Sequence, residues 1–242
     1  MCYRSAVLGP GLESVMLARR FISAVAMILA MCGAFLFLPA WTLRWWRAWT
    51  FIGVMVAAWT VTMFAVFARR PDLLNERFKT RFPKDQPLAD KIAVVLLIAS
   101  YYGLMSFIPV DVFHLHLLPR PAIAVSSLGL LLFVAGWTLI SLAFRENSFA
   151  VPAVRLQTER GQTVVDSGVY RIVRHPLYAG SVLLIAGMPL WLESYAATVL
   201  ALVPVAILIV RILGEEKFLR RELTGYAAYT QRVRYRLVPF VW

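Results

Sequence analysis

The chain has 242 residues, of which 60% are hydrophobic and 16% are charged, and it carries a formal net charge of +12. Soluble domains contain about 45–50% apolar and about 25% charged residues, so this composition excludes an ordinary soluble domain. The cations are dispersed in short segments between apolar runs rather than gathered in one basic patch, and we expect no nucleic-acid partner. Cys2 and Cys32 are too few for a disulfide framework.

Six long stretches are almost free of Asp, Glu, Lys and Arg. They cover residues 21–40, 49–68, 92–110, 121–144, 176–192 and 194–212. A bilayer core of about 30 Å requires about 20 apolar residues in a helix, and the backbone groups in lipid must be satisfied within the segment. The sequence therefore predicts an all-α fold: a single membrane domain, residues 1–242, forming a polytopic transmembrane helical bundle of about six spans.

The basic residues lie mainly on one side of these spans. If the N-terminus is placed in the cytoplasm, only Arg44, Arg47 and Arg120 among the 25 Lys and Arg fall on the outer side. This asymmetry is the positive-inside pattern, and it predicts that both termini are cytoplasmic and that the basic segments face anionic membrane lipids. The preference for arginine over lysine is compatible with a bacterial inner membrane.

Three connections between the spans are notable in chain order. The first, Arg69–Lys91, is polar and contains several prolines. The second holds Asp111, His114 and His116, which could be imagined as a metal site, but a fourth ligand is missing and we expect no metal. The third, Arg145–His175, has the densest polar residues of the chain, and long connections of this kind are usually functional.

Beyond the sixth span the pattern changes again. From Gly214 onward, Phe218, Leu219, Leu223 and Tyr226 recur at helical spacing, with basic residues on the opposite side. This pattern predicts an amphipathic helix that lies on the cytoplasmic interface and folds back beneath the bundle.

The segment Gly168–Gly180 combines several residues that can bind a ligand. Pro176 stands where a helix can begin, with His175 near the cap. A helix start has free backbone N–H groups, and here Arg171 and Arg174 flank it, so the segment can form an anion site.

A second polar element is the pair Glu215-Glu216, which we expect to return to the same membrane face as His175. Tyr178 lies within one turn of that histidine, and Gly180 allows another backbone or a ligand to approach closely. Topology alone would also place arginines at this helix start, and a glutamate pair suits the start of a surface helix. These residues by themselves leave a ligand site and a structural role as open alternatives.

Three motifs follow one another in the C-terminal part of the chain. They are Gly168 to Gly180, Glu215-Glu216, and Tyr226-x-x-Tyr229-x-x-Arg232-Val233 closing on Pro239. In this order they resemble the isoprenylcysteine carboxyl methyltransferase family of integral membrane methyltransferases. The Arg-His-Pro-x-Tyr part is similar to phospholipid methyltransferases as well. The likeness covers residues from about 120 to 242, and it departs from the family at Leu223-Thr224-Gly225, where an acidic pair is usual.

The resemblance implies that S-adenosylmethionine binds at the cytoplasmic face to the part of the chain from residue 145 to 242. It implies Arg174, His175 and Glu216 as catalytic residues. The residues implied in cofactor binding are Gly168, Val169, Tyr170, Arg174, His175, Pro176, Tyr178, Gly180, Glu215, Glu216 and Tyr229. The C-terminal helix with its tyrosines would close over the cofactor.

The implied reaction is methyl transfer to a lipophilic acceptor that enters sideways from the bilayer, most like isoprenylcysteine carboxyl methylation. A carboxylate is already ionised at neutral pH, so proximity and orientation would carry the catalysis. An amine must first lose a proton, and His175 or a glutamate would have to accept it. A phospholipid amine and a small thiol therefore remain alternative acceptors.

Two other functions remain open. NADPH-dependent membrane sterol or enone reductases have a similar Arg-His-Pro-x-Tyr-x-Gly stretch, but they usually carry an acidic residue where this chain has Ser181, and they lack the Glu215-Glu216 arrangement. A non-catalytic membrane protein that has kept the pocket is the third reading. The sequence does not indicate an oligomeric state.

Overall fold

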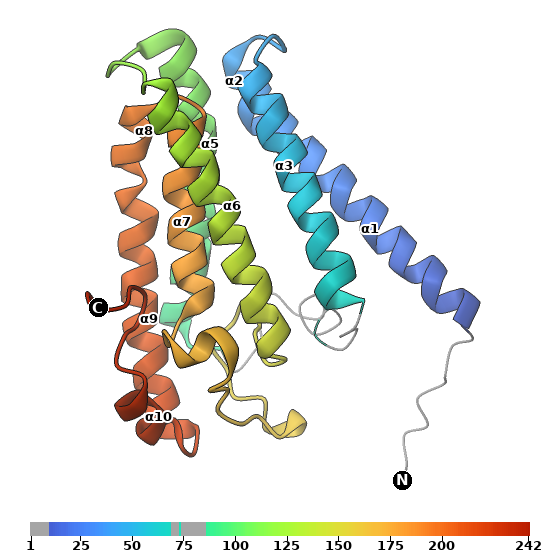
Figure 1. Ribbon diagram of the computed structural model, residues 1–242, viewed down its shortest axis with the longest axis vertical. Coiled ribbons are helices and arrows are strands. Elements are labelled where there is room, and N and C mark those ends of the chain that lie inside the picture. The colour runs from blue at the N-terminus through green and yellow to red at the C-terminus, as the bar shows by residue number, and fades with distance from the viewer. Residues whose placement is uncertain (1–9, 69–72, 74–85) are drawn as a thin grey trace.

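The chain folds into a helical bundle, shown in Figure 1. The computed structural model describes residues 10–68, 73 and 86–242, and it contains no β-strand within those ranges. Five helical units are long and apolar enough to cross a membrane: Phe21–Ala40, Trp46–Phe67, Leu88–Leu115, Ile123–Glu146 and Tyr195–Glu222. A shorter apolar helix, Pro176–Trp191, runs through the same bundle. The prediction of an all-α integral membrane protein with about six spans is confirmed.

Several spans are composites of consecutive helical elements. In chain order the elements are α1 (Pro10–Cys32), the π-helical turn η1 (Gly33–Phe37), α2 (Leu38–Ala40), α3 (Trp46–Thr62), η2 (Met63–Phe67), α5 (Leu88–Val110), η3 (Asp111–Leu115), α6 (Ile123–Glu146), the 3-10 turns η4 (Thr158–Arg160) and η5 (Gly168–Arg171), α7 (Pro176–Trp191), α8 (Tyr195–Leu200), α9 (Leu202–Glu222) and α10 (Tyr226–Arg232). Most of the connection Arg69–Lys91 lies outside the described residues.

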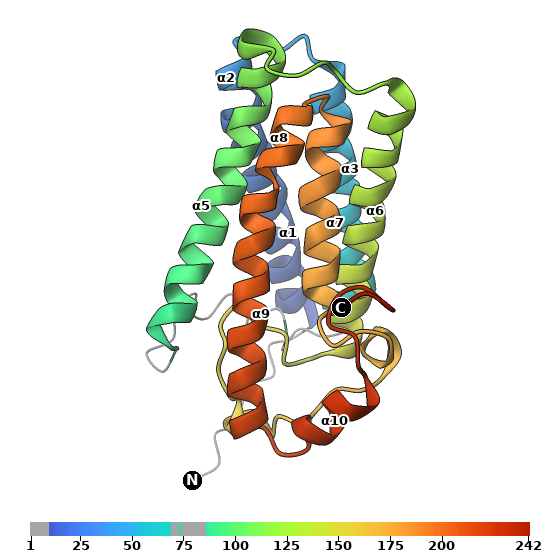
Figure 2. The ribbon, with the colours of Figure 1, turned by 90° about the vertical axis from the view of Figure 1, so that its left-hand side faces the viewer.

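The helix that we predicted to begin near Gly214 is not a separate element. α9 continues through that glycine to Glu222 without a break, because the residues between them are mostly good helix formers. The chain turns only after Leu223, where Gly225 adopts a φ of +86°. The short helix α10 then lies across the end of the bundle (Figure 2). We call this end of the molecule the α10 end.

Glycines allow α6 and α7 to pack backbone against backbone. A Cβ atom on Gly136 would lie 2.6 Å from the carbonyl oxygen of Gly180, and one on Gly187 would lie 2.5 Å from the carbonyl oxygen of Gly129. Helices in lipid associate through such close van der Waals contact, since no hydrophobic force acts between them there. The close approach expected at Gly180 is therefore that of the α6 backbone.

An arginine clamp ties α3 to the last turn of α7 at the end opposite to α10. Arg47 is buried; its Nη1 donates to the carbonyl oxygen of Trp191 at 3.1 Å, and its Nη2 lies 3.1 Å from Oε1 of Glu193. The indole Nε1 of Trp191 donates in return to the carbonyl oxygen of Arg47 at 2.9 Å. The guanidinium also stacks between the rings of Trp46 and Trp191. This outer arginine is thus a structural residue.

The side chains considered as a metal site are engaged in separate contacts at the same end. The carboxylate of Asp111 accepts hydrogen bonds from Oγ of Ser194 at 2.6 Å and from the backbone N–H of Leu117 at 2.9 Å. Nε2 of His114 lies 2.8 Å from the carbonyl oxygen of Pro39. In the described part of the chain no three His, Cys, Asp or Glu side chains gather as metal ligands.

We predict that Gly187→Ala lowers the free energy of unfolding by about 1–3 kcal/mol, because the added methyl group forces α6 and α7 apart. Gly103→Ala is the matched control: this glycine lies inside α5 with no atom near its missing Cβ, so alanine should leave stability unchanged or raise it. Thermal unfolding of both variants in detergent measures the difference. Equal stability of the two variants would contradict the close packing.

Candidate functional site

A cavity of about 460 Å³ lies toward the α10 end of the bundle. Its wall is built from α3, α5, α6, α7, α9, α10 and the connection between α6 and α7. The polar side chains in this wall, apart from its tryptophans, are Thr62, Asn147, Arg155, Gln162, Thr163, Tyr170, Arg174, His175, Tyr178, Ser181, Arg211, Glu215, Tyr226 and Tyr229. Cavities of this size bind small ligands and cofactors. Seven of the eleven predicted cofactor-binding residues line it: Tyr170, Arg174, His175, Pro176, Tyr178, Glu215 and Tyr229.

Glu216 is the centre of a buried ionic cluster behind the cavity wall. Its Oε1 accepts a hydrogen bond from Nε of Arg174 at 2.7 Å and lies 3.1 Å from Nε2 of His175. Its Oε2 accepts from Nε of Arg236 at 3.1 Å. A carboxylate only accepts hydrogen bonds, so this arrangement requires the proton of the His175 ring to be on Nε2. The three predicted catalytic residues meet here, but Glu216 itself does not line the cavity.

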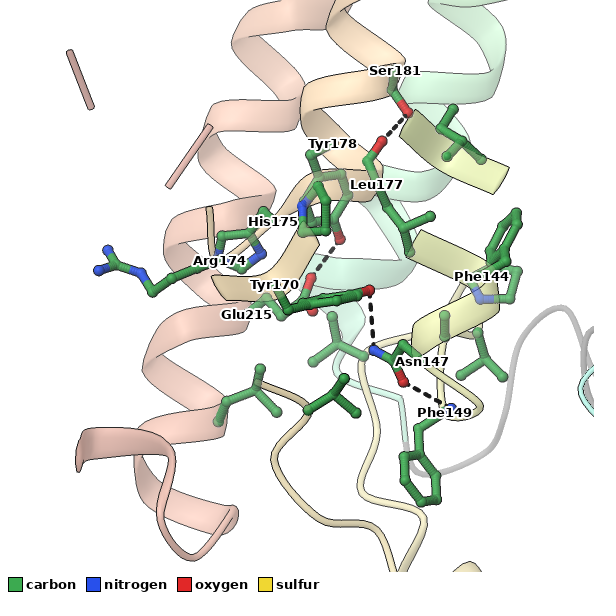
Figure 3. Close-up of a pocket in the computed structure, with 18 of the residues that line it drawn as sticks. Phe144, Asn147, Phe149, Tyr170, Arg174, His175, Leu177, Tyr178, Ser181 and Glu215 are labelled. Atoms are coloured by element: carbon green, nitrogen blue, oxygen red, sulfur yellow. Dashed lines mark hydrogen bonds between the residues drawn. The ribbon is translucent and has the colours of Figure 1, made fainter. Parts of the chain in front are cut away.

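Arg174 binds the segment that follows α10. Its Nη1 donates to the carbonyl oxygens of Val233 and Arg234, each at 2.9 Å. Its backbone N–H donates to the carbonyl oxygen of Tyr235, and the next N–H, of His175, donates to that of Arg236. Two of the N–H groups that we expected to be free for an anion are therefore occupied. Figure 3 shows the Arg174 side chain extending away from the other labelled residues.

The neighbouring Glu215 faces the cavity. The hydroxyl of Tyr178 donates to its Oε2, as the dashed line in Figure 3 shows. Among the described residues no cation lies within ion-pair distance of Glu215, whereas Glu216 has three nitrogen partners. Consecutive residues of a helix point about 100° apart, which explains why two adjacent glutamates have different surroundings. Glu215 is thus a carboxylate without an ion-pair partner in the cavity wall.

Three tyrosines and Asn147 form the side of the cavity toward α10. Nδ2 of Asn147 donates to the hydroxyl of Tyr170 at 3.1 Å, and the hydroxyl of Tyr229 donates to the carbonyl oxygen of Tyr170 at 2.8 Å. The hydroxyl of Tyr226 is buried and has no hydrogen-bond partner within the described ranges. Burial raises the pKa of the Tyr170, Tyr226 and Tyr229 phenols, so they stay protonated at neutral pH. They can donate hydrogen bonds to a ligand.

An ion pair that we did not predict borders the same cavity. Nε of Arg211 donates to Oδ1 of Asp90 at 2.9 Å, and another guanidinium N–H donates to the carbonyl oxygen of Pro152. Oδ2 of Asp90 accepts from the backbone N–H of Val154 at 3.0 Å. The pair therefore attaches the α6–α7 connection to α5 and α9. The sequence signal was available, since both residues lie at the ends of apolar runs on the same membrane face.

The part of the cavity wall farther from α10 is mostly apolar and belongs to the membrane-spanning helices. The side chains are Trp59 and Thr62 of the α3 span, Leu97 of α5, Trp137 and Ile140 of α6, Leu177 and Ser181 of α7, and Leu208 of α9. The cavity thus joins a polar part near α10 to an apolar part at membrane depth. A ligand with one polar end and one lipophilic end matches this wall.

Three other predicted residues lie outside the cavity. Gly168 has a φ of +51°, and a Cβ atom there would lie 2.6 Å from the carboxyl carbon of Glu146, so this position requires glycine. Val169 lies in the same 3-10 turn and does not line the cavity. Gly180 faces α6. These residues shape the segment that carries Tyr170 and Arg174 without lining the cavity themselves.

We predict opposite effects for the two glutamates. Glu216→Gln should lower the free energy of unfolding by about 3–5 kcal/mol, because it leaves buried cations without their carboxylate. Glu215→Gln should change stability by less than about 1 kcal/mol, because this carboxylate has no ion pair to lose. Chemical or thermal unfolding of both variants in the same detergent tests this. A large loss of stability in Glu215→Gln with no loss in Glu216→Gln would show that Glu215, and not Glu216, is the structural carboxylate.

A family model described as phospholipid methyltransferase matches residues 124–224. The match begins in α6 and ends just after α9, so it includes the segment from Gly168 to Gly180 and both glutamates. No curated protein matches the chain with significant similarity. The match agrees with the resemblance seen in the motifs. Residues 124–224 of the chain are therefore similar to the phospholipid methyltransferase family of membrane methyltransferases.

Proposed function

We propose that the chain transfers a methyl group from S-adenosylmethionine to a lipophilic acceptor at the cytoplasmic membrane face. One observation carries the proposal: a cavity that is lined in large part by the segment matching the methyltransferase family model joins a polar wall to an apolar wall at membrane depth. A polar cofactor can enter such a cavity from water, and a lipid can enter it from the bilayer. The basic residues at the α10 end support its placement on the cytoplasmic side.

The polar part of the wall fits the cofactor. S-adenosylmethionine carries a cationic sulfonium and an ammonium group, and Glu215 is a carboxylate in the wall that has no ion-pair partner among the described residues. The cofactor also carries hydroxyl and carboxylate oxygens, and the buried hydroxyl of Tyr226 has no hydrogen-bond partner in the part of the chain that the structure describes. An unsatisfied buried hydroxyl costs about 1–3 kcal/mol, which a ligand oxygen would recover. Glu215 and Tyr226 are thus the residues that would hold it, with Tyr178 orienting the glutamate.

The bound cofactor supplies an electrophilic methyl group. The protein side of the catalysis is orientation: the ionic cluster of Glu216 fixes the start of α7, and Tyr178 in its first turn donates to Glu215. The apolar wall excludes water from the acceptor, which strengthens each remaining electrostatic contact. Positioning of two reactants can contribute about 7–11 kcal/mol in favourable systems.

The charges in the wall favour an amine acceptor over a carboxylate. The three arginines of the wall are already paired, Arg155 with Glu159, Arg174 with Glu216 and Arg211 with Asp90. Among the described residues of the wall, a carboxylate would therefore find no unpaired arginine. An amine must lose its proton before it reacts, and Glu215 is the available carboxylate. His175 is less suited because its Nε2 is directed at Glu216. The family description, phospholipid methyltransferase, points to the same class of acceptor.

We predict that S-adenosylhomocysteine stabilises the purified protein and that NADPH does not. At 100 times its dissociation constant the ligand should add about 2.7 kcal/mol to the free energy of unfolding. Tyr226→Phe should keep or raise the stability of the free protein and weaken this binding about tenfold, the loss of one ligand hydrogen bond. Tyr195→Phe, at the opposite end of the bundle, is the control and should bind normally. Stabilisation by NADPH alone would support a reductase instead, and stabilisation by neither ligand would support a non-catalytic protein.

We predict further that vesicles of phosphatidylethanolamine accept methyl groups from radiolabelled S-adenosylmethionine, and that prenylated cysteine does so poorly. With an amine the rate should rise with pH, because only the deprotonated amine reacts, whereas an ionised carboxylate should give a nearly flat profile above pH 6. Glu215→Gln should lower turnover of the amine, and the exposed Glu222→Gln should not. A flat profile with prenylated cysteine as the better acceptor would assign carboxyl methylation.

A further inference from the structure

The last six residues form a turn that exposes apolar side chains. We call residues 237–242 the C-terminal hook. Phe240 is 88% exposed, Val241 78% and Val238 51%. Exposed apolar side chains that cluster in one ordered segment usually mark a contact with a partner or with a membrane.

The hook is held in one conformation by its own backbone. The N–H groups of Arg236, Leu237 and Val238 donate to the terminal carbonyl oxygen of Trp242 at 2.8, 3.0 and 3.3 Å. The guanidinium of Arg236 stacks on the Trp242 ring, 4.9 Å from its centroid. Phe240 has a φ of +67°, a conformation that is unfavourable for a bulky residue. Its ring packs beside that of Tyr235, with 5.2 Å between the ring centroids, and most of its surface is still exposed.

The hook lies level with the beginning of a membrane helix. The N–H groups of Arg174 and His175 donate to the carbonyl oxygens of Tyr235 and Arg236, immediately before the hook. The next residue along the chain, Pro176, begins the apolar helix α7. In Figures 1 and 2 the C-terminus stands well above the lower end of α9, at the height of the lower half of the bundle. After α10 the chain therefore returns to the level at which α7 begins, which we take as the bilayer surface.

Cations accompany the hook on the side of α10. Arg234 is exposed three residues before the hook, and the exposed Arg232 pairs with Asp166 at 2.8 Å. Basic residues are common where a segment contacts anionic lipid headgroups. We propose that the C-terminal hook inserts Val238, Phe240 and Val241 into the leaflet on the α10 side and is a membrane anchor. The occupant of this exposed apolar surface is lipid, because the surface stands at bilayer depth.

The anchor acts on the cavity through the segment that precedes it. Nη1 of Arg174 donates to the carbonyl oxygens of Val233 and Arg234, and Nε of Arg236 donates to Glu216. A tail fixed in lipid therefore keeps this segment seated on the ionic cluster behind the cavity wall. The proposal goes beyond methyl transfer and does not depend on it, since neither the contact nor its effect requires a bound cofactor.

Depth-dependent fluorescence quenching tests the insertion. In a background of Cys2→Ser and Cys32→Ala, the variants Phe240→Cys and Arg221→Cys each receive one environment-sensitive label, and the proteins are placed in phospholipid nanodiscs. Arg221 is the control, at the exposed end of α9. Lipids with a nitroxide near the headgroup should quench the label at position 240 several-fold more than at position 221, and aqueous iodide should show the reverse order. Equal quenching by iodide at both positions would overturn the proposal.

Hydrogen exchange tests the effect on the cluster. In nanodiscs, the double variant Phe240→Ser and Val241→Ser should speed amide exchange in the peptide that contains Arg174 and His175 about tenfold, because burial of one large apolar side chain is worth at least that factor. Phe240→Leu keeps an apolar side chain and should exchange like the unmodified protein. Unchanged exchange in the serine variant, with α7 still protected, would overturn the coupling. Both readouts are made without cofactor, so they can fail while the methyltransferase proposal holds.

Discussion

The structure depends above all on the buried carboxylate of Glu216. A carboxylate removed from water must be paired, and Arg174, His175 and Arg236 surround this one from two other segments of the chain. The cluster therefore fixes the end of α9, the start of α7 and the C-terminal segment relative to one another. The Nε and Nη1 groups of Arg174 donate to atoms of the protein and are therefore not free to donate to a ligand. Arg174, His175 and Glu216, which carry the motifs, therefore hold the helices around the cavity in place.

Glu215, the residue before Glu216, is the carboxylate that faces the cavity. Glu215 is held by the hydroxyl of Tyr178 and has no ion-pair partner among the described residues, so its charge is available to a ligand. The Asp90–Arg211 pair secures the opposite side by binding Pro152 and Val154 of the α6–α7 connection. This distribution favours a cationic or amine ligand over an anionic one.

The apolar runs were sufficient to predict the spans, because composition along the chain determines them. The gathering of Arg174, His175 and Glu216 was implied by the resemblance of the motifs to a known family. Helix ends were less predictable: α9 continues eight residues beyond Gly214, since local propensity there favours helix and only Gly225 supplies the turn. The Asp90–Arg211 pair joins residues 121 positions apart, and its formation depends on the depth and rotation of two helices. Periodicity in one helix cannot supply that information.

Part of the cavity wall lies outside the segment that matches the family model. The family match covers residues 124–224, yet Trp59, Thr62 and Leu97 belong to helices before it and line the apolar part of the cavity. Their sequence has no motif, because a wall for a lipid chain requires only apolar volume at the right depth, and many side chains supply it. The polar part needs particular atoms at particular places and therefore leaves a recognisable pattern. Under the proposed function, the cofactor end would be set by the motif-bearing half of the chain, and the size and shape of the acceptor by the half that carries none.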